Sequence, residues 1–217
     1  MNYFWGFENT VKGGDYSLSI RYQPINSLNI NLSGSYSTYW RRQDQFVTSI
    51  KYNNTTRIIV SEVDQKTLRF VLRVNYNITP DLTLQYYGQP YITRPLYTSF
   101  GYITNSLAKH YDDRFHVFTA NEISGSNGEY FVDETGDGVP DYSFANPDFN
   151  FVQFRSNFVL RWEYKPGSEF YVVWSRGNTP DAFGDTDTPL GQSLYSNAFA
   201  EHARNIFLIK VTYRFLR

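Results

Sequence analysis

The chain has 217 residues, a formal net charge of -1 and no cysteine, which excludes disulfides, thiolate metal sites and the basic surface expected of a nucleic-acid-binding protein. Aromatic residues make up 19% of the chain, and this enrichment favours β-strands. The sequence contains no run of about 18 apolar residues, so we expect no transmembrane helix. A mean hydropathy of -0.48 is compatible with a membrane β-barrel, because strands of such barrels alternate between apolar and polar residues.

Apolar and polar residues alternate along seven stretches of the chain, which indicates strands with one apolar and one polar face. In one of them Leu72 and Val74 share a face, while Arg73 and Asn75 share the other. The longer stretches reach roughly 9–13 residues, enough for a tilted strand to cross a bilayer. In chain order the stretches are 15–23, 28–36, 68–78, 82–87, 152–164, 170–174 and 207–215, and an eighth strand is expected near 2–8.

The connections between these stretches alternate between short and long. Residues 24–27, 79–81 and 165–168 are tight turns that each contain a proline, which pre-sets the bend. The long connections are 39–67, 91–150 and 176–204, and the first is expected to contain a hairpin of residues 45–52 and 57–63. Short periplasmic turns and long extracellular loops are typical of outer-membrane barrels.

The fold class predicted for residues 1–217 is therefore all-β, as a single antiparallel up-and-down transmembrane β-barrel domain of about eight strands. The sequence that begins Met1-Asn2-Tyr3 does not have the pattern of a signal peptide, which is a basic region, an apolar region and a cleavage site of small residues. We therefore expect this domain to be the C-terminal portion of a longer barrel. The expected localisation is the outer membrane, with membrane lipid as a partner.

Five blocks of sequence carry a resemblance to a known family. They are 64–68 (DQKTL), 75–86 (NYNITPDLTLQY), 89–91 (QPY), 146–151 (NPDFNF) and 155–168 (RSNFVLRWEYKPGS). In these blocks the chain resembles Gram-negative outer-membrane β-barrel proteins of unknown function that often follow a domain like the family 9 carbohydrate-binding modules. The resemblance implies that further strands and the carbohydrate-binding-like domain lie upstream. It implies no catalytic residue.

The end of the chain supplies a further cue. Tyr213-Arg214-Phe215 looks like the aromatic-ended signal that the barrel assembly machinery reads, which makes that machinery an expected partner through the C-terminal strand. Leu216 and Arg217 follow, so the aromatic residue is not strictly terminal.

An acidic segment is a candidate calcium loop. Asp133, Asp137 and Asp141 are spaced so that their carboxylates could converge on one hard cation, and two intervening glycines permit a sharp turn. The segment departs from the usual pattern, because Thr135 occupies the third position and Phe144 the twelfth. The alternative interpretation is a solvated acidic turn without a metal.

Seven basic residues are expected on the polar face, where they would line the barrel lumen. They could favour anionic or sugar-like solutes, or they could pair with acidic residues such as Glu163 and fill the lumen. In a soluble sheet the same residues would form an ordinary solvated face. They are Arg21, Arg69, Arg73, Arg155, Arg161, Lys210 and Arg214.

The sequence predicts no enzyme. It contains no nucleophile elbow, phosphate-binding loop or dinucleotide fingerprint. His110, His116 and His202 lack metal-ligand spacing. We therefore expect a non-enzymatic barrel segment that acts as a channel or scaffold. The alternatives are a soluble β-sandwich that binds carbohydrate through surface aromatic residues, and a component of a glycan-active enzyme.

Overall fold

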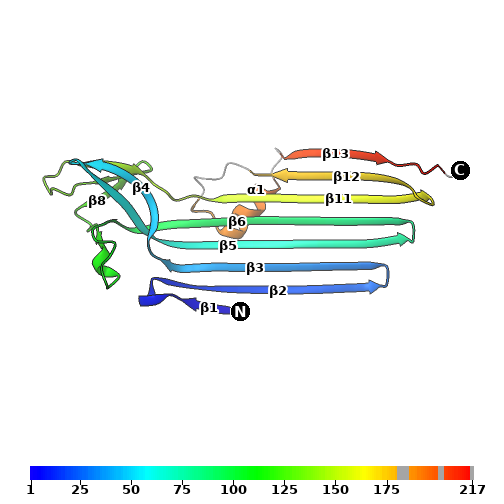
Figure 1. Ribbon diagram of the computed structural model, residues 1–217, viewed down its shortest axis with the longest axis horizontal. Coiled ribbons are helices and arrows are strands. Elements are labelled where there is room, and N and C mark those ends of the chain that lie inside the picture. Colours follow the sequence, from blue (N-terminus) through cyan, green and yellow to red (C-terminus); the bar gives the residue numbers. More distant parts are fainter. Residues whose placement is uncertain (180–185, 200–202, 216–217) are drawn as a thin grey trace.

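The computed structural model describes residues 1–179, 186–199 and 203–215, so His202, Leu216 and Arg217 lie outside the described residues. It is an all-β protein with antiparallel sheets (Figure 1). The strands of the main sheet are, in spatial order, β1 (Asn2–Trp5), β2 (Val11–Ile25), β3 (Leu28–Arg42), β5 (Thr55–Thr79), β6 (Leu82–Ile103), β11 (Phe151–Lys165), β12 (Ser168–Asn178) and β13 (Arg204–Val211).

The remaining elements lie in the long connections. Strand β4 (Gln45–Tyr52) pairs with β5, and β7 (Phe115–Val117) pairs with β6. A second sheet of three strands consists of β8 (Ile123–Ser126), β9 (Glu129–Val132) and β10 (Tyr142–Ala145). The helical elements are η1 (Phe7–Asn9), η2 (Asp112–Arg114) and α1 (Leu190–Ala198). None of the helices in the described part of the chain is long and apolar enough to cross a membrane.

The seven expected strands and the eighth near the N-terminus are confirmed, as is the hairpin of β4 and β5. The expected strands 57–63 and 68–78 are one continuous strand, β5, and β6 extends to Ile103, into the expected long connection 91–150. The three expected tight turns are also present, and each leaves two residues between its strands: Asn26-Ser27, Pro80-Asp81 and Pro166-Gly167. Gly167 has a φ of 76°, a left-handed conformation that glycine adopts without strain. Figure 1 shows these turns at one end of the sheet and the long connections at the other.

The prediction for the last strand was too long, because β13 ends at Val211 rather than at residue 215. Thr212 and Glu169 still exchange two main-chain hydrogen bonds, of 2.8 and 3.1 Å. Beyond this pair the neighbouring strand β12 has already reached its turn at Gly167. The residues after Thr212 therefore have no strand to pair with on that side.

The main sheet is open in the described residues. Its path begins at β1 and finishes at β13, and these two strands lie at opposite edges (Figure 1). The antiparallel all-β prediction is confirmed, whereas a closed barrel is not found in the described part of the chain.

The sheet separates an apolar face from a polar face. Directly paired residues of neighbouring strands point to the same face, so each register row can be assigned to one side. One row joins Tyr16, Tyr36, Leu68, Ile92 and Val152. The next row, on the other side, consists of polar residues and one tyrosine: Ser17, Ser35, Arg69, Tyr91 and Gln153.

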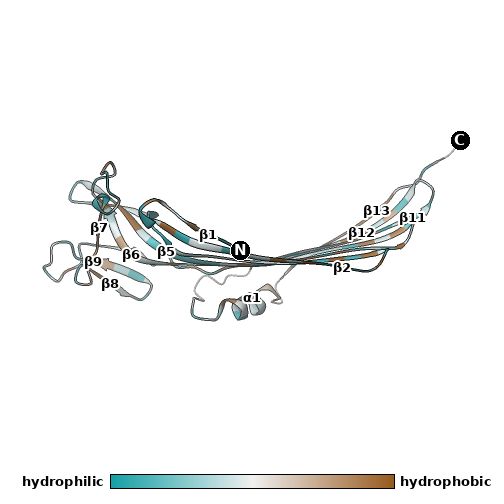
Figure 2. Ribbon diagram, turned by 90° about the horizontal axis from the view of Figure 1, so that it is seen from below, coloured by the Kyte–Doolittle hydropathy of each residue, from teal (hydrophilic) through white to brown (hydrophobic). Residues whose placement is uncertain are grey.

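The apolar face is covered locally by α1, a helix that the strand patterns did not predict. Leu194 and Ala198 of the helix pack against Ile92, Val152 and Phe154 of the sheet. Figure 2 shows α1 against one face of the bent sheet. The three-stranded sheet packs against the ends of β5 and β6 rather than against the residues that α1 contacts.

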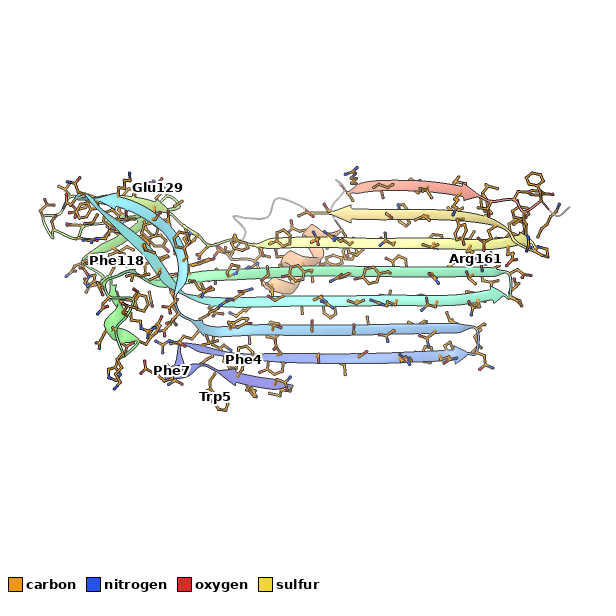
Figure 3. All side chains as sticks on the ribbon, in the orientation of Figure 1. Phe4, Trp5, Phe7, Phe118, Glu129 and Arg161 are labelled. Atoms are coloured by element: carbon orange, nitrogen blue, oxygen red, sulfur yellow. The ribbon has the colours of Figure 1, made fainter. Side chains whose placement is uncertain are left out.

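A second apolar core lies at the end of the sheet that carries the long connections. It joins the ends of β5 and β6 to the three-stranded sheet through Ile59, Phe100, Phe118, Val132 and Phe144. We call β4, β7 to β10 and the adjoining ends of β5 and β6 the loop cap. Phe118 and Glu129 mark its position in Figure 3.

Candidate functional site

Six of the seven basic residues predicted to share a face do share it. The register row Arg21–Asn31–Arg73–Tyr87–Asn157 runs across five strands of the polar face. Arg155 lies in the next row of this face, and Arg69 lies in the row after that. Nearer the turns, Arg161 pairs in register with Tyr171, which pairs with Lys210. The sheet thus brings the cations of strands far apart in sequence onto one surface.

One cation near the tight turns, Arg161, is paired with acids. Nε of Arg161 donates to Glu169 over 2.9 Å, and its guanidinium also lies 3.4 Å from Glu163. The Tyr171 hydroxyl donates to Glu169 over 3.0 Å, and Nζ of Lys210 lies 5.7 Å from the centre of the Tyr171 ring. Arg161, Tyr171 and Lys210 therefore form one connected group at this end of the polar face, and Glu163 is one of the acids that pair with Arg161. Whether the basic residues line or fill a lumen stays a prediction. Arg161 is labelled in Figure 3.

Arg214 differs from the other six cations. It lies beyond the end of β13, where its main-chain N–H donates to the Ser168 hydroxyl over 3.0 Å. Its side chain passes so close to Gly167 that a β-carbon there would lie 2.5 Å from Cδ of Arg214. The alternation that placed Arg214 on the polar face assumed a strand that continues to residue 215, and β13 ends before it.

The acidic loop is organised by its own main chain. The Asp133 carboxylate accepts hydrogen bonds from the N–H groups of Gly136 and Gly138, over 2.7 and 2.8 Å. The Asp141 carboxylate accepts one from the N–H of Glu134 over 2.8 Å and one from the Tyr52 hydroxyl, also over 2.8 Å. Gly136 and Gly138 have φ values of 73° and 83°, which explains why glycine occupies both positions.

These hydrogen bonds stabilise the charged form of both carboxylates. Desolvation alone would raise the pKa of Asp133, but the N–H groups of Gly138 and Gly136 outweigh it and lower the pKa below its ordinary value. For Asp141, desolvation is likewise outweighed by the Tyr52 hydroxyl and the main-chain N–H of Thr135, so its pKa is also lowered.

The loop does not present a ready set of metal ligands. The Asp137 carboxylate accepts a hydrogen bond from the N–H of Val139 over 2.9 Å, so each of the three predicted ligands already serves the main chain. No group of three or more His, Cys, Asp or Glu side chains placed to hold a metal exists within the described residues. Calcium binding by Asp133, Asp137 and Asp141 stays a prediction.

An ion pair that the sequence did not reveal connects the acidic loop to the β4–β5 hairpin. The guanidinium of Arg57 lies 3.0 Å from the carboxylate of Glu134, and its Nε donates to the same group. The Tyr142 hydroxyl also donates to Glu134, and the Arg57 guanidinium lies 4.4 Å from the centre of the Tyr102 ring. Arg57 and Glu134 are 77 residues apart, so no local sequence pattern could have paired them.

His110 and His116, the two histidines that the structure describes, do not gather into a site. His116 lies 2.7 Å from Glu122, and His110 lies 3.4 Å from Glu8. The N–H and hydroxyl of Thr119 and the imidazole of His116 all hydrogen-bond the Glu122 carboxylate and lower its pKa. These contacts tie neighbouring loop segments together.

The geometry defines an all-β protein whose main sheet divides an apolar face from a charged, hydrogen-bonded polar face. The family model described as Domain of unknown function (DUF5916) matches residues 1–216, and the chain belongs to this family. Comparison with curated proteins gave no match, and comparison with solved structures gave none either.

Proposed function

We propose that the chain is a segment of an outer-membrane β-barrel, with its apolar face toward lipid and its polar face toward an aqueous lumen. In this role it is a non-enzymatic channel or scaffold that carries the loop cap at the outer surface. The partner that the proposal requires is the bilayer.

The observation that carries the proposal is the exposure of the apolar face. Leu18 on β2 is 67% exposed and Phe207 on β13 is 72% exposed. Large apolar side chains of this face are therefore exposed near both edges of the sheet. Soluble monomers rarely expose contiguous apolar patches larger than a few hundred Å². Further exposed members of this face are Ile20, Tyr22, Leu32, Phe70, Trp162, Ile209 and Val211.

The positions of the tight turns also support a barrel. The row through Leu82, at the β5–β6 turn, meets β11 at Trp162, three residues before that strand ends at Lys165. On the other side of β5, strand β3 begins at Leu28. The register row of Leu28 passes through Leu84 of β6, which is two residues farther from the β5–β6 turn than Leu82. From the first hairpin to the third, the turns therefore shift along the strands by five residues in total (two plus three). A line drawn through the turns is oblique to the hydrogen-bonded register rows.

This obliquity corresponds to a strand tilt. Five residues span about 17 Å along a strand, and the four strand spacings between the first and third hairpins span about 19 Å. If the turns are level with a membrane surface, the strands tilt by about 40° from its normal. Strands of transmembrane barrels tilt by about 35–45°. A β-sandwich would not require this regular stagger.

Native tryptophan fluorescence tests the proposal without any label. Trp162 and Trp174 both lie on the apolar face, in rows with Leu82 and Phe158. Trp5→Phe and Trp40→Phe remove the emission of the other two, exposed tryptophans. In vesicles whose acyl chains carry bromine, we expect the emission of Trp162 and Trp174 to be quenched, whereas aqueous iodide should quench it little. A variant with Trp162→Phe and Trp174→Phe is the control, and it should lose most of the quenching by bromine.

Efficient quenching by iodide, with no quenching by brominated lipid, would contradict the proposal. A folded, monodisperse protein in plain buffer would then favour the soluble β-sandwich, in which the apolar face is covered by protein.

A further inference from the structure

Helix α1 lies at a defined level of the apolar face. It rests on Ile92 and Val152, and Ile92 is ten residues along β6 from Leu82 at the turn (92 minus 82). The exposed apolar side chains of Leu32 and Phe70 lie between this level and the turns. The helix therefore marks the end, toward the loop cap, of the exposed apolar band between Leu32 and Phe70 and the turns. Figure 2 shows α1 partway along the strands, on one face of the sheet.

The helix is fastened to this level by polar contacts as well as by packing. Nη1 of Arg94, on β6, donates to the carbonyls of Thr186 and Thr188 just before the helix, over 2.8 and 2.6 Å. Nδ2 of Asn150 donates to the hydroxyl of Ser193 over 2.8 Å, and both of these residues are fully buried. These contacts fix the height of α1 on the sheet.

The outer surface of α1 is uncharged and exposes one aromatic residue, Tyr195, beside Gly191, Gln192 and Ser196. Tyr195 is 72% exposed and Phe199, next to the helix C-terminus, is 50% exposed. Their rings contact each other at a centroid distance of 5.7 Å, and Phe199 also contacts Phe154 of the sheet at 5.1 Å. No residue between Leu190 and Ala198 carries a charge. The packing on the sheet therefore leaves these two rings uncovered.

The height of α1 coincides with a bilayer boundary if the sheet is tilted as derived above. Ten residues of β6 span about 33 Å, which is about 25 Å along the membrane normal at a tilt of about 40°. The lipid-facing apolar band of a transmembrane barrel is about 25 Å tall. An aromatic residue with a polar tip, such as tyrosine, favours the headgroup region that borders this band.

We propose that α1 is an interfacial helix that binds the lipid headgroup region on the loop-cap side of the membrane. Tyr195 and Phe199 insert at the boundary between headgroups and acyl chains, and the docking of α1 on Arg94 and Asn150 transmits this anchoring to the barrel wall. The partner of this surface is a lipid bilayer, and the inference therefore rests on the proposed function. It adds to that function the height at which the barrel lies in the membrane.

Spin labels on single cysteines test the inference, because the chain has no cysteine of its own. Tyr195→Cys reports on α1, and its high exposure makes a folding defect unexpected. The references are Leu32→Cys on the apolar face, Ser33→Cys on the polar face and Val139→Cys in the exposed part of the loop cap. Collision rates with oxygen and with a water-soluble nickel chelate give the depth of each label in vesicles.

The expected order of depth is Leu32 deepest, Tyr195 intermediate and Val139 in water, with the Ser33 label shielded from lipid. A Tyr195 label as accessible to nickel as the Val139 label, with the Leu32 label still deep, would overturn the role of α1 and leave the barrel intact. A Leu32 label that collides with nickel as readily as the Val139 label would overturn the barrel itself. A Tyr195 label as deep as the Leu32 label would also refute an interfacial position.

Discussion

Replacing Leu32 by arginine tests which face of the sheet meets lipid. Leu32 is 45% exposed and lies on β3 between Ile20 and Leu72, its register partners on the two neighbouring strands. Its surroundings on this face contain no acid that could pair with an arginine. If the face lies in a bilayer, Leu32→Arg should destabilise the folded protein by about 2–4 kcal/mol, the cost of arginine near the midplane of a barrel wall.

This cost corresponds to about a 30- to 900-fold change in the folding equilibrium. Ser33→Arg is the matched control, because Ser33 is the next residue of β3 and points to the opposite face, where Ser19 and Val71 are its partners. An arginine in an aqueous lumen should change the free energy of unfolding by no more than about 0.5 kcal/mol.

Urea unfolding of the two variants in lipid vesicles, followed by tryptophan fluorescence, measures the difference. The reasoning is refuted if Leu32→Arg unfolds at the same urea concentration as the unmodified chain. It is equally refuted if Ser33→Arg is the more damaging change, since the two faces would then be reversed.

Three further predictions concern the loop cap and α1. The pKa of Asp141 is lower in the folded than in the unfolded protein, so its contribution to stability is present above about pH 4 and is lost as the pH falls through the folded pKa. Proteolysis of residues 129–145 should therefore become faster below about pH 4. The increase should be smaller in Asp141→Asn. Arg57→Gln leaves the Glu134 carboxylate, whose side chain is 11% exposed, without its cation, and should loosen the same segment by about 1–3 kcal/mol in hydrogen exchange, with no change in the main sheet. Leu194→Ala should weaken the docking of α1 by about 2–5 kcal/mol, seen as faster exchange in α1 alone; unchanged exchange would show that the polar contacts suffice.

The strands and tight turns could be predicted from the sequence because their signals are local. The two-residue alternation around Leu72 and Arg73 fixes which side chains share a face, and the register preserves that assignment across the neighbouring strands β3 and β6. The proline turns fix where neighbouring strands reverse. The same logic failed for Arg214, because whether a strand continues depends on a partner strand that the alternation does not contain.

The loop cap and α1 could not be predicted in the same way. The Arg57–Glu134 pair and the apolar core that joins Ile59 to Val132 depend on contacts between distant loops. The helix had a weak local signal, since Pro189 precedes Leu190, Leu194 and Ala198 at four-residue spacing. That signal is short, and packing against Ile92 of the sheet supplies most of what stabilises so short a helix.

The central claim is that this sheet forms part of a membrane barrel wall, and heat-modifiable gel mobility tests it most directly. The chain is refolded in detergent micelles and, in parallel, in plain buffer, and each sample is run with and without boiling. We predict a folded band that shifts on boiling and that forms only with detergent. A soluble, monodisperse, β-rich species that forms in buffer and shows no such shift in detergent would contradict the account.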